Sequence, residues 1–173
     1  AALMWWFQGG FSTSNLLGLL FCALTAYVIL ETNNANALIR VRTRFVSCLW
    51  IVGAACTTFL HGAVAPLFVA FCLSVSYSQI CRTYQRHDAA VQAFHANLFL
   101  SIGSLAFPPM LLLSFCYGVY FSVYMRCMNL RLIMASLIAL LLPYSIWMGW
   151  CVWQEDFGPL LAHLSSIAEF RFP

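Results

Sequence analysis

Two histidines are the side chains best suited to chemistry in this sequence, because the chain around them is almost entirely apolar. His61 and His95 lie next to or within apolar stretches. An ionisable group inside a membrane segment is by default a candidate functional residue. We expect His61 at a turn on the outer side and His95 about one helical turn inside the opposite boundary. At that separation, neither a shared metal site nor a proton relay is expected.

A serine next to a glycine invites comparison with serine hydrolases. Gly103-Ser104 lacks the Gly-x-Ser-x-Gly pattern of a nucleophile elbow, because Leu105 follows the serine. No histidine is expected at the depth of Ser104. We therefore interpret Ser104 as part of a small-residue packing face that also contains Gly103 and Ala106.

The thiols and carboxylates do not form a recognisable site. The eight cysteines show no CxxC and no His/Cys ligand spacing, and most lie in apolar runs, where a thiol packs as a small group. The aspartates and glutamates fall at boundaries or in loops, whereas ion-coupled pumping and intramembrane aspartyl proteolysis need carboxylates inside the spans. We therefore predict no metal site, no cofactor and no catalytic residue.

The chain contains no lysine, and seven of its eight arginines fall in three short clusters. The stretches between clusters, residues 45–81 and 87–125, each have somewhat more than 30 residues, which is long enough for an out-and-back helical hairpin. Because Lys and Arg are enriched in cytoplasmic loops, we predict that all three clusters are cytoplasmic. They are candidates for contacts with lipid headgroups or partner proteins. The clusters contain Arg40, Arg42 and Arg44, then Arg82 and Arg86, then Arg126 and Arg131.

The composition explains why these clusters matter. Hydrophobic residues make up 63% of the 173 residues and charged residues 8%, against about 45–50% and about 25% in soluble domains. A chain with so much apolar surface needs lipid as its solvent. The formal net charge of +3 reflects the predicted loops and not a basic patch, so a nucleic-acid partner is not expected.

The apolar segments predict an all-α, multi-pass transmembrane bundle within residues 1–158. A span of 16 residues is only about 24 Å long, less than a hydrocarbon core of about 30 Å, so short spans should thin the bilayer or lie behind neighbours. Residues 159–173 are predicted to form an amphipathic helix on the outer membrane surface or against a partner. The six predicted spans are 15–30, 45–60, 64–81, 91–107, 110–125 and 132–153.

Two of the expected hairpins show a weak internal similarity. A shift of 44 residues aligns Phe71-Cys72 with Phe115-Cys116 and Arg82 with Arg126. Such a repeat would be parallel, about an axis along the membrane normal, as in some transporters. Alternatively, any two apolar hairpins with proline at the turn and arginine at the foot match this well, and the sequence leaves both explanations open. The opening residues 1–7 are typical of the end of an earlier apolar segment, which would make the N-terminus truncated.

Several short motifs resemble an uncharacterised family of polytopic inner-membrane proteins from Gram-negative bacteria. The resemblance covers about residues 16–147 and implies a helical membrane architecture with no established activity. The motifs are Arg42-Thr43, His61, Thr83-Tyr84-Gln85, Gly103-Ser104-Leu105, Asn129-Leu130-Arg131 and Pro143-Tyr144.

Together, these features favour a non-enzymatic protein of the bacterial inner membrane, acting as an accessory or scaffolding subunit of a larger complex with lipid and protein partners. The main alternative is a small-molecule or lipid transporter built on two repeated hairpins, and an enzyme that processes lipids is a third candidate. A transporter would need a polar cavity. Its candidate lining residues are His61, His95, Asn97, Ser101, Ser104 and Ser122.

Overall fold

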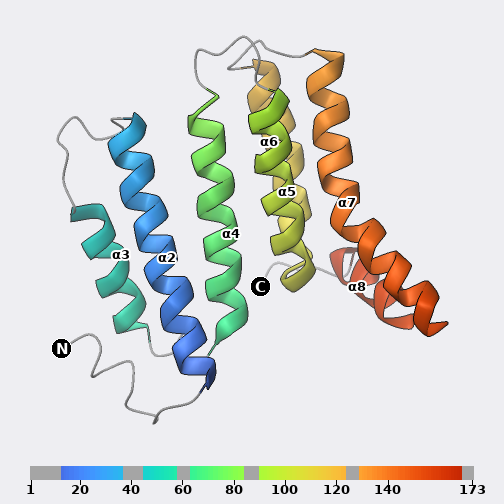
Figure 1. Cartoon of the computed structure of the whole chain (residues 1–173), viewed down its shortest axis with the longest axis horizontal. Helices are drawn as coiled ribbons and strands as arrows, with labels where there is room; N and C mark the ends of the chain where they lie inside the picture. The colour runs from blue at the N-terminus through green and yellow to red at the C-terminus, as the bar shows by residue number, and fades with distance from the viewer. Residues whose placement is uncertain (1–12, 37–44, 58–62, 84–89, 124–128, 169–173) are drawn as a thin grey trace. The chain divides into compact units, whose positions relative to one another are not determined.

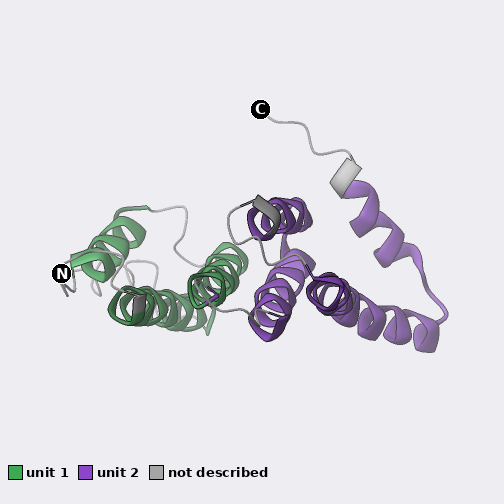
Figure 2. Ribbon diagram, turned by 90° about the horizontal axis from the view of Figure 1, so that it is seen from above, with its two compact units in different colours: residues 1–82 green, residues 83–173 purple. Residues whose placement is uncertain are grey.

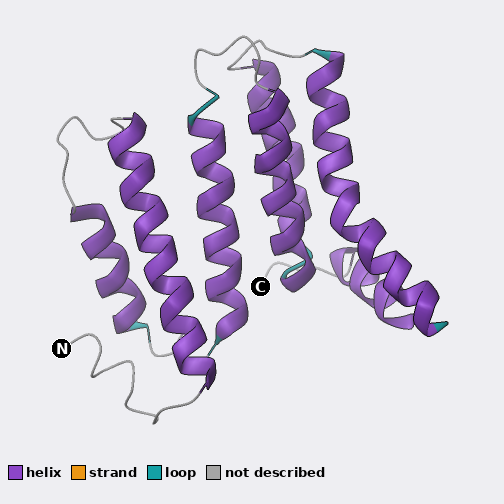
Figure 3. Cartoon of the chain, viewed as in Figure 1, coloured by secondary structure: helices purple, strands orange, loops and turns teal. Residues whose placement is uncertain are grey.

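The computed structural model describes residues 13–36, 45–57, 63–83, 90–123 and 129–168, and every regular element in these ranges is an α-helix (Figure 3). The prediction of an all-α chain is therefore confirmed for the described residues. Within the described residues, each predicted span and the predicted C-terminal helix overlap one helix each. The helices are α2 (Thr13–Asn36), α3 (Phe45–Cys56), α4 (Val64–Cys81), α5 (Ala90–Ala106), α6 (Met110–Val123), α7 (Leu130–Gln154) and α8 (Gly158–Ala168).

Among the helices that the structure describes, three, and not the predicted six, are both long and apolar enough to cross a membrane. These are α2, α4 and α7, whereas α3, α5 and α6 are apolar but have 12, 17 and 14 residues. At about 1.5 Å per residue, a helix of 12 residues reaches about 18 Å. All six helices are apolar, so it is their length that distinguishes the three that could cross a membrane from the three that are too short.

The chain divides into two compact units, residues 1–82 and residues 83–173 (Figure 2). In unit 1, α2 packs against both α3 and α4, and α2 and α4 run in the same direction (Figure 1). In unit 2, α5 packs against both α6 and α7, and α8 contacts α7. In each unit, the first helix (α2 or α5) thus packs against both of the two helices that follow it in the sequence.

Unit 1 is held by aromatic and small side chains. Phe21 of α2 lies edge-on to Phe68 of α4, with 5.3 Å between the ring centroids. Cys22, Ala54 and Leu67, one from each helix, are buried together. Ser47 of α3 donates a hydrogen bond to a main-chain carbonyl of α2, at 3.1 Å. The predicted partners 45–60 and 64–81 therefore both have α2 as their main neighbour.

The helix α2 continues past the boundary that its polar residues predicted. The span was expected to end at residue 30, but the helix extends to Asn36. Within the extension, the Thr32 hydroxyl donates to the Val28 carbonyl at 2.7 Å. A polar segment keeps its main-chain hydrogen bonds when it remains helical. The change from apolar to polar residues therefore does not by itself end the helix.

A proline and a left-handed residue shape the end of α7. Pro143 lies inside the helix, and α7 changes direction along its length (Figure 1), as expected where a proline removes an N–H donor. The helix ends at Glu155, which has φ of 56° and ψ of 19°. The Glu155 and Asp156 amides donate back to the Val152 and Cys151 carbonyls. This is a Schellman ending, whose left-handed position usually holds glycine.

We predict that Glu155→Gly stabilises the chain by about 0.5–1 kcal/mol, because glycine has no Cβ to oppose the left-handed conformation. The gain should appear as a higher midpoint of thermal unfolding in detergent, followed by circular dichroism. Glu155→Ala is the matched control, because it removes the charge but keeps a Cβ. An equal gain in both variants would contradict the conformational explanation.

Candidate functional site

The buried face of α5 consists largely of small and polar side chains. They recur at intervals of three and four residues and therefore share one face of the helix. In lipid, small residues allow helices to approach closely, and polar side chains can bond across the interface. We call Asn97, Ser101 and Ser104 the polar row. The buried residues of α5 are Ala93, Ala96, Asn97, Leu100, Ser101, Gly103 and Ser104.

Asn97 joins the helices α5, α6 and α7 of unit 2. Its Nδ2 donates to the Ala93 carbonyl at 3.0 Å and to the Ser136 Oγ of α7 at 3.2 Å. Its Oδ1 accepts a hydrogen bond from the Ser114 Oγ of α6 at 3.1 Å. The side chain is only 2% exposed. One buried amide therefore has both its donor and its acceptor atoms used inside the helix bundle.

Ser101 bonds to the part of α7 that a proline disturbs. Its Oγ donates to the Leu140 carbonyl at 2.8 Å. Leu140 lies three residues before Pro143, whose ring and missing N–H weaken the main-chain hydrogen bonds of the preceding turn. Ala139, beside Leu140, is fully buried. A small residue on α7 and a hydroxyl on α5 thus fit the disturbed turn.

Ser104 continues the row toward the end of α5. Its Oγ donates to the Ser101 carbonyl at 2.6 Å and lies 2.8 Å from the Tyr144 hydroxyl oxygen. Because a serine has one hydroxyl proton, Tyr144 is the donor in the second contact. The three α5–α7 contacts join residues 39, 39 and 40 positions apart in the sequence. A constant offset means that α5 and α7 are parallel neighbours in a fixed register.

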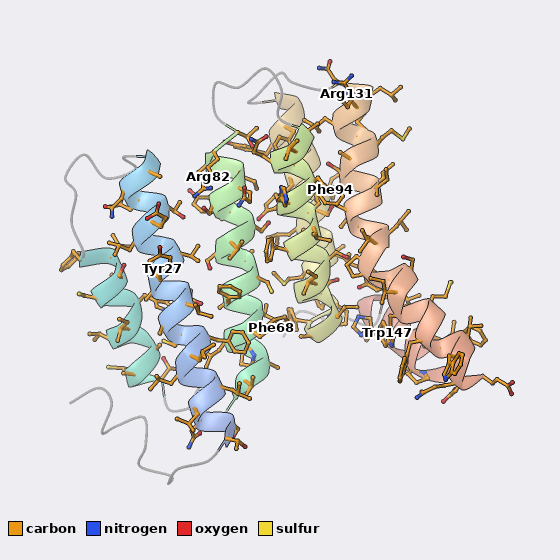
Figure 4. All side chains as sticks on the ribbon, in the orientation of Figure 1. Tyr27, Phe68, Arg82, Phe94, Arg131 and Trp147 are labelled. Carbon is orange, nitrogen blue, oxygen red and sulfur yellow. The ribbon has the colours of Figure 1, made fainter. Side chains whose placement is uncertain are left out.

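The helix α8 reaches the polar row through a histidine. The His163 Nε2 lies 3.1 Å from the main-chain oxygen of Ser104. Four residues after Ser104 stands Pro108, which has no N–H to offer this carbonyl. The His163 ring is perpendicular to that of Trp147, at 5.0 Å between centroids, and Figure 4 shows Trp147 where α7 meets α8. His163 therefore supplies the donor that the main chain lacks.

This arrangement does not match a serine–histidine catalytic pair. The His163 Nε2 contacts the main-chain oxygen of Ser104 and not its Oγ, which is bonded to Ser101 and Tyr144. Ser104 is also fully buried. A nucleophile needs a base within hydrogen-bond reach and access for a substrate. In the described part of the chain, no group of three or more His, Cys, Asp or Glu residues could hold a metal ion.

The structure brings together three of the predicted cavity residues, Asn97, Ser101 and Ser104, but their side chains bond to other residues of unit 2. His95 is on the exposed side of α5, with its Nδ1 2.9 Å from the Val91 carbonyl oxygen, so it lies apart from the polar row. Ser122 belongs to α6, but the position of its side chain is outside the described residues, as is His61.

The arginines are only partly described. Arg82 is exposed at the C-terminal end of α4, and Arg131 is exposed in the first turn of α7 (Figure 4). These two residues are consistent with an interfacial role but have no contact with the polar row. The other predicted contact residues lie outside the described residues: Arg40, Arg42, Arg44, Arg86 and Arg126.

Four residues of the site were not among those predicted from the sequence: Ser114, Ser136, Tyr144 and His163. The eight-residue spacing of Ser136 and Tyr144 places them on one face of α7, which is a usable signal. Pro108 is a second signal, because it leaves the Ser104 carbonyl without a main-chain donor. The expectation that no histidine lies near Ser104 was wrong, since His163 approaches its main-chain oxygen from a helix 59 residues away in the sequence.

The fold and the polar row define an all-helical protein with helices able to cross a membrane, whose second unit is joined by internal hydrogen bonds. Comparison with protein-family models, with curated proteins and with solved structures finds no match. The resemblance to a family of inner-membrane proteins therefore remains an expectation based on short motifs.

We predict that Asn97→Ala destabilises unit 2 by about 1–3 kcal/mol, because it leaves the partly buried hydroxyl groups of Ser114 and Ser136 without their partner. Ser114→Ala and Ser136→Ala should each couple to Asn97 by about 0.6 kcal/mol, a typical value for helix–helix hydrogen bonds in membranes. Double-mutant cycles measured by unfolding in mixed micelles test this. Ser145→Ala is the matched control, because this exposed serine of α7 bonds only to its own helix. Zero coupling in both cycles would refute the role of Asn97.

Proposed function

We propose that the chain is a multi-pass protein of the bacterial inner membrane that acts as a non-enzymatic accessory or scaffolding subunit of a larger complex. The observation that carries this proposal is that the polar row is buried and hydrogen bonded inside the protein. Asn97, Ser101 and Ser104 are buried and hydrogen bonded within unit 2, so their side chains serve the packing of helices. A transport path or an active site would need such groups available to a substrate.

The outer surfaces of the helices support the same proposal. Large apolar side chains are exposed on every helix that the structure describes, including Val91 and Leu105 on α5. Phe45, Leu49 and Val52 form one such face on the short helix α3, and Phe115 and Val119 form another on α6. Helices this short fit poorly across a hydrocarbon core of about 30 Å when they stand alone. Neighbouring helices of a complex would shelter them.

The proposed topology has six crossings, with the arginine clusters in the cytoplasm. Arg82 follows α4 and Arg131 begins α7, and two helices lie between them in the sequence. If α5 and α6 cross as a hairpin, both arginines are on the same side, as the positive-inside rule requires. The C-terminal end of α7, with exposed Trp150 and Trp153, is then on the outer side.

A transporter or lipid-handling protein is the second candidate, and the similar packing of the two units favours it. In each unit, the first helix is the neighbour of the second and the third. Many transporters consist of two structural repeats. This correspondence pairs α2, α3 and α4 with α5, α6 and α7, and it differs from the 44-residue hairpin repeat.

A scaffold should be recovered with its partners in near-equal amounts. We predict that an affinity-tagged chain, extracted in mild detergent, co-purifies with stoichiometric membrane proteins identified by mass spectrometry. His61→Ala, His95→Ala and Ser104→Ala should leave this recovery unchanged, because neither histidine lies in the polar row and Ser104 serves internal packing. Recovery of the chain alone, with substrate flux in vesicles that Ser104→Ala abolishes, would favour the transporter instead.

The topology has its own test. Single cysteines replacing Arg82, Arg131 or Trp153, in a chain whose native cysteines are changed to alanine, report which side each position faces. We predict that a membrane-impermeant maleimide labels the position of Trp153 on intact spheroplasts and labels the two arginine positions only after permeabilisation. Labelling of either arginine position from outside would overturn the proposed topology.

A further inference from the structure

The last helix, α8, has two different sides, and one of them docks inside unit 2. Leu160 is buried, and His163 contacts both the end of α5 and the ring of Trp147. Near these residues runs an apolar stripe of Phe157, Leu161 and Leu164, which are 45%, 64% and 43% exposed. The Phe157 carbonyl accepts the Leu161 amide at 3.1 Å, so Phe157 is in register with the helix. Spacings of four and three residues put the stripe on one face.

The position of α8 after α7 indicates what covers this stripe. The 25 residues of α7 measure about 37 Å at about 1.5 Å per residue, so a crossing helix of this length reaches past a core of about 30 Å. Its last turns expose Trp150, Val152 and Trp153, the last at 83%. Tryptophan is enriched where hydrocarbon meets headgroups. The stripe of α8 begins three residues after α7 ends, so it follows the apolar and aromatic end of α7 directly in the sequence.

We infer that α8 lies along the outer face of the bilayer and inserts Phe157, Leu161 and Leu164 into the boundary between headgroups and acyl chains, while His163 fixes it to α5. The occupant of the stripe is thus a lipid surface. This inference rests on the membrane crossing of α7 proposed above. It selects the membrane surface over a protein partner, the two alternatives that the sequence left open for this segment.

Two charged residues set the depth of the helix. Glu155 and Asp156 are exposed in the turn between α7 and α8. The Asp156 Oδ1 accepts the Gly158 amide at 2.9 Å, which caps the first turn of α8. Because charged side chains are costly in hydrocarbon, this turn remains among the headgroups. Interfacial helices typically bury their apolar face by about 5–10 Å, which suits a helix that starts at such a turn.

The test determines whether each face of α8 is in contact with lipid, water or protein. Leu161→Cys, Leu164→Cys and Ala162→Cys, each in the full chain with native cysteines changed to alanine, are spin-labelled in vesicles of phosphatidylethanolamine and phosphatidylglycerol. Power-saturation EPR compares collisions with oxygen, which concentrates in lipid, and with a water-soluble nickel chelate. We expect oxygen to exceed nickel at positions 161 and 164, and the order to reverse at Ala162, an exposed position off the stripe.

Each other outcome overturns the inference. Strong nickel collisions at positions 161 and 164 mean that the stripe faces water. Weak collisions with both reagents mean that a protein or a second copy of the chain covers it. If the cysteine-free chain does not fold, benzoylphenylalanine at position 161 of the otherwise native chain gives the same decision. Lipid adducts support the inference, and protein cross-links or a lack of adducts contradict it.

The anchoring role of His163 is measured on the same label. In Leu164→Cys, adding His163→Ala should increase label mobility, whereas His163→Gln should restore it, because the glutamine amide also offers an N–H at this position. Equal mobility in both variants would remove His163 from the inference. A negative result for α8 can be distinguished from a wrong topology, because the maleimide test at the Arg82 and Arg131 positions does not involve α8.

Discussion

The amide of Asn97 is the interaction on which the arrangement of unit 2 depends. Its two polar atoms bond to side chains of both α6 and α7, and it is buried between them. Helices in lipid gain little by covering apolar surface, so close packing of small residues and hydrogen bonds hold them together. An amide left unpaired in an apolar interior costs about 2–7 kcal/mol. Both neighbouring helices are therefore kept where their serines reach Asn97.

Two prolines explain where the other hydrogen bonds of unit 2 go. Pro108 denies a main-chain donor to the Ser104 carbonyl, and Pro143 disturbs the turn that contains the Leu140 carbonyl. The structure supplies His163 to the first carbonyl and Ser101 to the second. Without His163 the Ser104 carbonyl would have no donor, which is costly inside an apolar bundle. Pro143 removes the donor of the Ala139 carbonyl, beside Leu140, and not that of Leu140 itself. The contacts of Ser101 and Ser104 thus depend on the requirements of the backbone as well as on side-chain chemistry.

Local features were predictable from the sequence, and the pairing of helices was not. The bounds of α4 match the predicted span 64–81, and α6 begins at the predicted residue 110, because apolar runs and breakers such as Pro108-Pro109 act locally. The polar row was recognised as a set of candidate residues. Its partners on α7 were not, because an offset of 39 or 40 residues depends on how helices pack. Apolar content also overstated the number of helices long enough to cross a membrane, because it does not fix helix length.

The common plan of the two units argues against the 44-residue repeat that the sequence left open. That repeat equates α3 with α5, yet α3 has α2 as its main neighbour, whereas α5 is the neighbour of two helices and carries the polar row. Equating α2 with α5 matches central helix with central helix. A unit of three crossing helices starts and ends on opposite sides of a membrane, so a second such unit begins where the first ended. If the helices cross as proposed, Arg82 and the start of α7 share one side, which is the distribution of charge that orients membrane proteins.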